Sequence, residues 1–186
     1  NADSILSGNP KYSGALRGNP ADWDVLPKDF VLYCVKFINQ WHANYLRRGV
    51  DQITINGASK TVVRHKQYVE NDELSNLISA SLMSNEFPVS VENAEGVKQT
   101  CTLLLTFDSS NKITVSTTTE GYTATGSGTF VPKGEKNSWG NKDRDVVYLN
   151  YNITSNSGVA YATKDTLVVQ GRGVKIETFT PLYVSN

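Results

Sequence analysis

The sequence is poor in the residues on which most catalytic and metal sites depend. Its 186 residues include only two histidines, two cysteines and one methionine. His42 and His65 form no HxxxH or HExxH pair, so each fits a surface or hydrogen-bonded histidine better than a catalytic base or zinc ligand. A GxSxG turn, a P-loop and a GxGxxG turn before a helix are also missing. We therefore expect no cofactor, no metal site and no catalytic residue.

The sequence also lacks an excess of either charge and any long apolar run. Eighteen basic and eighteen acidic residues cancel, and no Lys/Arg run supplies the positive patch of a nucleic-acid-binding protein. No stretch approaches the roughly 18 apolar residues that a membrane-spanning helix needs. Nucleic acid is therefore not an expected partner.

Cysteine usage leaves two interpretations open. Cys34 and Cys101 lie in apolar runs and share no CxxC spacing. Both fit small buried hydrophobic residues, and a single disulfide is the alternative in an oxidising compartment. Two cysteines alone do not make a zinc site, because zinc takes four ligands.

What the sequence does contain is typical of an all-β protein. Hydrophobic residues make up 39% and charged residues 19%, and Thr, Ser, Asn and Gly are frequent. Short apolar runs recur between turn signals such as Asn56-Gly57, and residues alternate in polarity from Val147 to Ile153. A long open meander would leave unpaired edges. We predict an all-β fold, with an antiparallel barrel or barrel-like sandwich over 41–186 and a separate strand-bearing segment over 1–40.

Several local expectations follow from the same patterns. Residues 30–38 carry the strongest strand signal of the first half, and 71–79 is the one short helix candidate. Ten side chains are expected in the interior. They are Tyr45, Val62, Leu103, Leu105, Val115, Leu149, Tyr151, Val168, Val174 and Ile176.

The polar segment 133–145 contains one tryptophan, Trp139, between two strand-like runs. Its indole face offers a stacking surface for a sugar ring, and neighbouring polar side chains offer contacts to hydroxyl groups. The alternative is that Trp139 folds back and plugs one end of a barrel or sandwich, anchoring the segment. The candidate ligand-binding residues are Trp139, Asn137, Asn141, Asp143 and Arg144.

Carboxylates in the same segment allow two further chemistries. Glu135, Asp143 and Asp145 could supply the acid and base of a glycoside hydrolase if two of them faced each other across a cleft. With Asn137 and Asn141 they could also offer oxygen ligands to Ca²⁺, although the EF-hand spacing and its glycine are missing.

Five strings together resemble a known family of Bacteroidota surface lipoproteins, which are encoded beside SusC/SusD-type glycan uptake systems and consist largely of domains of unknown function. The strings are 29–33, 41–49, 103–108, the Trp139 segment and 165–169. The resemblance implies an immunoglobulin-like β-sandwich followed by a lipocalin-like barrel. Residues 1–40 would close the first domain and 41–186 would form the second. The resemblance transfers no catalytic or binding residue.

The resemblance and the Trp139 segment lead to one expected function. This is a non-catalytic glycan-binding or accessory domain of a polysaccharide uptake system, at the cell surface, with a glycan and SusC/SusD-type outer-membrane proteins as partners. Membrane attachment would be only through a lipid anchor, and the family's lipoprotein signal and acylated cysteine are absent from this sequence. The alternatives are a structural or adhesin-like subunit that contacts a partner protein and, third, a glycan-active hydrolase.

Overall fold

The computed structural model describes residues 7–28 and 35–173, and the chain forms two compact units. The larger unit comprises 37–174, and the smaller one comprises 1–36 and 175–186. Each is described by itself. The predicted division between residues 40 and 41, and the immunoglobulin-like nature of 1–40, stay predictions.

The smaller unit contains a two-stranded antiparallel sheet of β1 (Asn9–Pro10) and β2 (Trp23–Val25), with the 3-10 helix η1 (Pro20–Asp22) between them. The carboxylate of Asp22 accepts hydrogen bonds from the Leu16 amide at 2.9 Å and from Asn19 Nδ2 at 2.8 Å. These bonds fix the connection between the two short strands.

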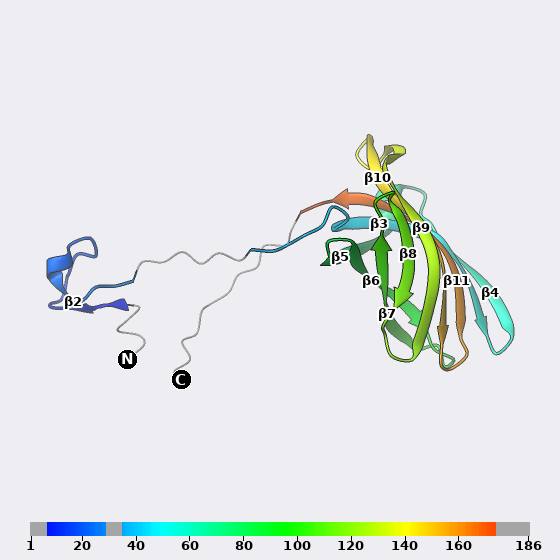
Figure 1. Ribbon diagram of the computed structural model, residues 1–186, viewed down its shortest axis with the longest axis horizontal. Helices are drawn as coiled ribbons and strands as arrows, with labels where there is room; N and C mark the ends of the chain where they lie inside the picture. Colours follow the sequence, from blue (N-terminus) through cyan, green and yellow to red (C-terminus); the bar gives the residue numbers. More distant parts are fainter. Residues whose placement is uncertain (1–6, 29–34, 174–186) are drawn as a thin grey trace. The chain divides into compact units, whose positions relative to one another are not determined.

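The larger unit is a closed antiparallel barrel, so the predicted all-β fold is confirmed (Figure 1). Eight strands follow one another around the barrel, and β11 closes it by pairing with β3. These strands are β3 (Ala43–Ile55), β5 (Glu73–Ser81), β6 (Ser84–Glu92), β7 (Lys98–Phe107), β8 (Lys112–Thr117), β9 (Tyr122–Ser138), β10 (Lys142–Ser155) and β11 (Ala160–Gly171).

The ninth strand, β4 (Ala58–Arg64), follows β3 through a tight hairpin. Asn56 and Gly57 both have positive φ, of 50° and 81°, which suits a two-residue turn of the I′ type. One edge of β3 is shared: residues 43–47 pair with β5, and residues 49–55 pair with β4. The barrel wall therefore changes partner beside Arg47, and this change of partner positions the site described below.

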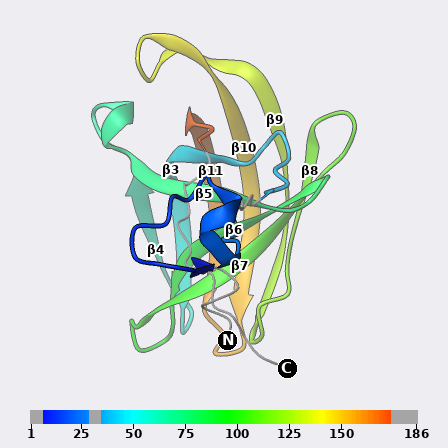
Figure 2. The ribbon, with the colours of Figure 1, turned by 90° about the vertical axis from the view of Figure 1, so that its left-hand side faces the viewer.

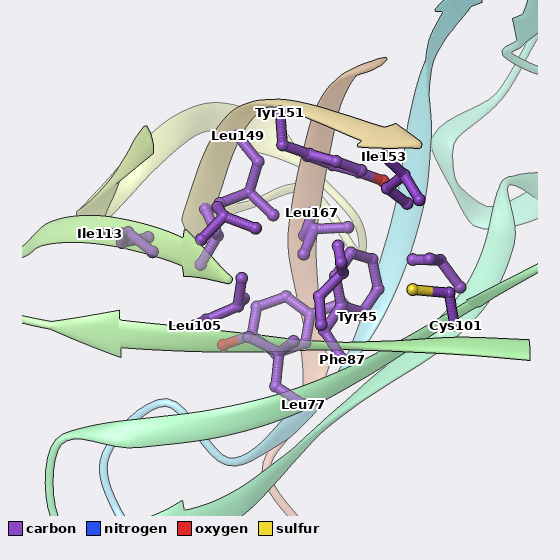
Figure 3. Close-up of a cluster of buried hydrophobic side chains, with 14 of the residues drawn as sticks. Tyr45, Leu77, Phe87, Cys101, Leu105, Ile113, Leu149, Tyr151, Ile153 and Leu167 are labelled. Atoms are coloured by element: carbon purple, nitrogen blue, oxygen red, sulfur yellow. The ribbon is translucent and has the colours of Figure 1, made fainter. Parts of the chain in front are cut away.

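Alternate residues of the strands fill the interior, as the two-residue period of a strand requires. Figure 3 shows side chains such as Tyr45, Phe87 and Leu105 converging from different strands. Trp41, which is 1% exposed, stacks on Phe107 with ring centroids 3.9 Å apart. Of the ten predicted interior residues, six belong to the main core: Tyr45, Leu103, Leu105, Val115, Leu149 and Tyr151. Val168 is also buried, but in a separate cluster.

A second, smaller cluster lies on the outer face of the barrel. It consists of Leu46, Val146 and Val168, whose neighbours Tyr45, Val147 and Leu167 point into the main core. The register places Leu46 beside Val168 and Val168 beside Val146, so the three form one apolar row across β3, β11 and β10. We call this row the outer cluster. The β9–β10 hairpin extends beyond one end of the barrel (Figure 2).

Three sequence expectations are wrong where the structure describes them. Residues 35–38 of the expected strand 30–38 have no regular structure, and 30–34 lie outside the described residues. The helix expected at 71–79 is replaced by the 3-10 helix η2 (Val69–Asn71) and by β5, because pairing with β3 overrides a weak helix signal. Val62 is exposed, since it lies on the added strand β4 rather than inside the closed barrel.

The remaining expectations concern the chain ends and the membrane. The predicted interior residues Val174 and Ile176 lie outside the described residues. Within 7–28 and 35–173, no helix has the length and apolar character needed to cross a bilayer.

Candidate ligand-binding site

Several charged side chains point into the barrel among apolar ones. Arg47 and Asp51 are on β3, and Asp165 faces them from β11. They are only 5%, 7% and 3% exposed. A charge removed from water is costly unless it is paired, so their partners decide whether this arrangement is stable.

Asp165 is the centre of the buried network. Its Oδ2 accepts hydrogen bonds from Arg47 Nε at 3.0 Å and from the Tyr151 hydroxyl at 2.8 Å. Its Oδ1 accepts from Arg64 Nη2 at 2.6 Å. Two guanidinium groups and a phenol thus hold one carboxylate, which compensates its burial.

Arg64, at the end of β4, joins this carboxylate to a second one. Its Nε and Nη2 donate to Asp51 at 2.6 and 2.8 Å in a bidentate pair. Thr163 donates a further hydrogen bond of 2.8 Å to Asp51. Arg47 in turn lies over the Phe87 ring at 5.1 Å, a cation–π contact. The network therefore connects β3, β4, β6, β10 and β11.

Asp51 and Arg64 stay charged, and Tyr151 stays neutral, over the physiological pH range. Burial raises the pKa of Asp51, but the hydrogen bonds and charge of Arg64 more than offset it and lower the net pKa. Burial, with the adjacent Asp165, raises the pKa of Tyr151 well above its usual value. Burial lowers the pKa of Arg64, but Asp51 and Asp165 outweigh it and raise the pKa overall. Proton transfer at neutral pH is thus not a property of these groups.

A cavity of about 290 Å³ opens beside the network. Its walls combine charged, aromatic and aliphatic side chains. They are Arg47, Asp51, Ile53, Lys60, Val62, Arg64, Glu73, Val89, Ser90, Val91, Glu92, Lys98, Tyr151, Ile153, Tyr161 and Thr163. Apolar walls with a few converging polar groups are typical of ligand sites, and this volume is at the lower end of their usual range of about 300–1,000 Å³.

An ion pair spans β4 and β6 at this cavity. Lys60 Nζ lies 3.1 Å from Glu92 Oε2, and both side chains are partly exposed. The backbone amide of Glu92 also donates to the Tyr161 hydroxyl at 2.6 Å. The ion pair connects β4 to β6, although β4 pairs only with β3 among the described strands, and the hydrogen bond connects β6 to β11.

The candidate residues predicted from the sequence lie together at the end of the β9–β10 hairpin. Asn141 lies in the turn with a positive φ of 54°, and Asn137, with a positive φ of 45°, lies at the end of β9 beside it. Asp143 accepts hydrogen bonds from Lys136 Nζ and the Asn137 amide, and Arg144 Nε donates to the Trp139 carbonyl at 2.8 Å. Much of the hydrogen-bonding capacity of these residues therefore shapes the hairpin.

Trp139 is half-buried and packs against the outer cluster, together with Val69 and Val131. It does fold back onto the barrel, but onto its outer face. The tryptophan that packs in the interior is Trp41. Part of the Trp139 indole is thus engaged with protein rather than with solvent.

Three loop carboxylates proposed for hydrolysis or calcium binding each contact a cation. Glu135 pairs with Arg48 at 2.8 Å and accepts from Tyr148. Hydrogen bonds from Lys136 and the Asn137 amide lower the pKa of Asp143. Burial raises the pKa of Asp145, but the Lys133 amide and Arg172 outweigh it and lower the pKa. Across the described residues, no three His, Cys, Asp or Glu side chains gather as a metal site.

The two histidines and Cys101 do not line the cavity. His42 Nδ1 accepts a hydrogen bond from the Ser79 amide at 3.1 Å, and His65 is exposed. Cys101 is a buried free thiol, and burial raises its pKa. Cys34 lies outside the described residues.

Sequence reasoning missed the buried network, although a signal was present. Tyr45, Arg47, Asp51 and Ile53 all have odd numbers within one strand, so they share a face. Two charged residues on a face that is otherwise apolar indicate a polar site inside the fold. Recognition of Asp165 and Arg64 as their partners required the register between β3, β4 and β11.

The comparisons with known proteins give the family. The model of a domain of unknown function, DUF5627, matches residues 40–173. The chain belongs to this family. A crystal structure from Bacteroides ovatus, described as structural genomics of unknown function, is 42% identical with a TM-score of 0.77. The match covers 91% of this chain and 54% of that one, so the chain spans about half of that protein. No curated protein matches.

Proposed function

We propose that this DUF5627 domain is a non-catalytic saccharide-binding domain and that its ligand occupies the barrel cavity. The main support for this proposal is the network of Arg47, Arg64, Asp51 and Asp165 beside a cavity of about 290 Å³. Charged groups inside a cleft are typical of functional sites. Apolar residues in their place would often make the fold equally stable, so stability does not explain the charges.

The cavity chemistry suits a sugar. Guanidinium and carboxylate groups match the paired donors and acceptors of sugar hydroxyls, and Ile53, Val89 and Ile153 offer apolar contact to the ring carbons. The cavity volume suits one sugar residue of a glycan rather than a long chain.

A binding role is favoured over hydrolysis by the state of the carboxylates. A glycosidase needs one carboxylic acid with a raised pKa. The pKa of Asp51 is lowered instead, and Asp165 is held by two arginines.

The cellular role that we propose is an accessory lipoprotein at the outer-membrane surface, in a SusC/SusD-type polysaccharide uptake system. The strings at 41–49 and 165–169 support this proposal, and so does the similarity to a Bacteroides ovatus protein that is 42% identical. These two strings also contain Arg47 and Asp165, which belong to the network.

A glycan array with purified protein tests the proposal, followed by titration calorimetry with each glycan that binds. Val62→Trp is the cavity variant, because Val62 lines the cavity and is 36% exposed, which leaves room for a larger side chain. Val63→Trp is the matched control on the other face of β4, where the side chain is 66% exposed. We expect binding by the wild type and by Val63→Trp, and loss of binding by Val62→Trp.

The same experiment separates the cavity from the Trp139 surface. Loss of binding in Trp139→Ala with full binding in Val62→Trp would move the saccharide to Trp139, Asn137, Asn141, Asp143 and Arg144. Absence of binding to every glycan on the array would contradict the proposed function.

A further inference from the structure

Arg47 and Arg64 each direct one guanidinium nitrogen away from the buried carboxylates. Nε and Nη2 of both arginines are bound to Asp51, Asp165 or Tyr151. Nη1 of Arg64 is buried and makes no hydrogen bond with any residue that the structure describes. A buried donor without an acceptor is unfavourable, so this nitrogen is a site where an acceptor is missing.

The carboxylate of Glu73 lies near the Nη1 atoms of both arginines and accepts a long hydrogen bond from Arg47 Nη1. Its Oε1 lies 3.5 Å from Arg47 Nη1, and its Oε2 lies 3.9 Å from Arg64 Nη1. Both distances exceed the 2.7–2.9 Å of a good charge-assisted hydrogen bond. They are also longer than the other hydrogen bonds of these arginines, which measure 2.6–3.2 Å. The Glu73 side chain is 47% exposed at the beginning of β5, whereas Asp165 is fully buried.

Glu73 thus occupies a place between two arginines without binding either one well. A carboxylate that entered from the cavity could approach both Nη1 groups more closely, because it is not tied to the backbone of β5. Displacement of Glu73 is easy, since its side chain is already partly in water.

We propose that the saccharide carries a carboxylate, as a hexuronic acid does, and that Arg47 and Arg64 bind it in the position of the Glu73 carboxylate. This inference rests on the proposed function, because it names the ligand class of the same cavity. Asp51 and Asp165 occupy the Nε and Nη2 groups of the two arginines, so the Nη1 groups, which make only long contacts with Glu73, are the donors left for a ligand carboxylate.

The experiment is titration calorimetry with four probes: D-glucuronate, D-galacturonate, D-glucose and D-galactose. Glu73→Gln removes the competing negative charge and keeps the side-chain size. Glu86→Gln is the matched control, because Glu86 is exposed on β6 and does not line the cavity. We expect at least one uronate to bind more tightly than its neutral counterpart, and Glu73→Gln to tighten it about tenfold further. Glu86→Gln should change neither affinity.

The outcomes distinguish this inference from the proposed function. Equal binding of neutral and acidic sugars, or uronate binding that Glu73→Gln leaves unchanged, overturns the inference and leaves the proposed function standing. If neither these probes nor the glycans of the array bind the wild type or Glu73→Gln, both fail. A gain in Glu73→Gln restricted to the uronates supports both.

Discussion

Gly49 lies directly opposite Asp165 in the β3–β11 pair, and it has no side chain at the point where the buried carboxylate meets Arg64. A Cβ atom at Gly49 would lie 2.3 Å from Asp165 Oδ1, 2.3 Å from the Lys164 carbonyl oxygen and 3.0 Å from Arg64 Nη2. Such distances are far inside van der Waals contact. The network inside the barrel therefore depends on a glycine as much as on its charged residues.

Gly49→Ala should destabilise the protein by about 1–3 kcal/mol, because the added methyl group pushes Asp165 away from its partners or shifts the backbone. Gly171→Ala is the matched control, since nothing lies within 4 Å of a Cβ at Gly171. Urea unfolding of the wild type and both variants measures the difference. Equal stability of all three proteins would contradict this prediction, because the barrel would then accommodate the methyl group at position 49 without loss of stability.

Removal of the central carboxylate should be more harmful. Asp165→Ala leaves the buried Arg47 and the partly buried Arg64 with one acceptor fewer each, and we expect a loss of about 3–5 kcal/mol in unfolding free energy. Lys60→Ala breaks the partly exposed pair with Glu92 and should cost less than about 1 kcal/mol. Similar losses in the two variants would contradict a central role for Asp165.

Stability should also depend on Asp51 at acid pH. The pKa of Asp51 is lowered from 3.8 in the folded protein, so the unfolded chain binds its proton first as the pH falls. The stabilisation by Asp51 is therefore complete above about pH 5 and is lost as the pH falls through the folded pKa, below about 4. The difference in unfolding free energy between the wild type and Asp51→Asn should shrink over this window. A difference that stays constant from pH 7 to about pH 2.5 would contradict the lowered pKa.

The strand pattern of the barrel could be predicted from sequence because strands have a strict period of two. That period predicts that Leu149 and Tyr151 lie inside, and both are buried. Val62 has the same apolar character but is exposed, because β4 pairs only with β3 among the described strands and lies outside the closed barrel. Which strands close a barrel depends on register and cannot be read from alternation.

The candidate site could likewise be predicted from the sequence only in part. Trp139 could be found from composition, since one tryptophan in a polar segment stands out. Arg47 and Asp165 are 118 residues apart, and only the closing pair β3–β11 brings them together. The charged residues on the apolar face of β3 are a local signal of the site, but the pairing of Arg47 with Asp165 across the first and last barrel strands has none.

The interior itself can be tested with two leucines. Leu105 on β7 and Leu149 on β10 are 0% and 3% exposed and belong to the main core (Figure 3). Truncation of either to Ala should cost about 2–5 kcal/mol, because it removes apolar contacts and leaves a cavity. Leu82→Ala is the control at a side chain that is 68% exposed. A loss below about 1 kcal/mol at both core positions would contradict the described register.

Trp139→Ala distinguishes anchoring from ligand contact at the hairpin. The half-buried indole covers Leu46, Val146 and Val168, so its removal should cost about 1–3 kcal/mol of unfolding free energy. Trp139→Phe keeps an aromatic ring for the outer cluster and should recover part of this loss. If the cavity holds the saccharide, both variants bind the glycan as the wild type does at temperatures where they are folded. Unchanged stability together with lost binding would instead assign the Trp139 face to the sugar, because a side chain that only anchors the hairpin cannot affect affinity without affecting folding.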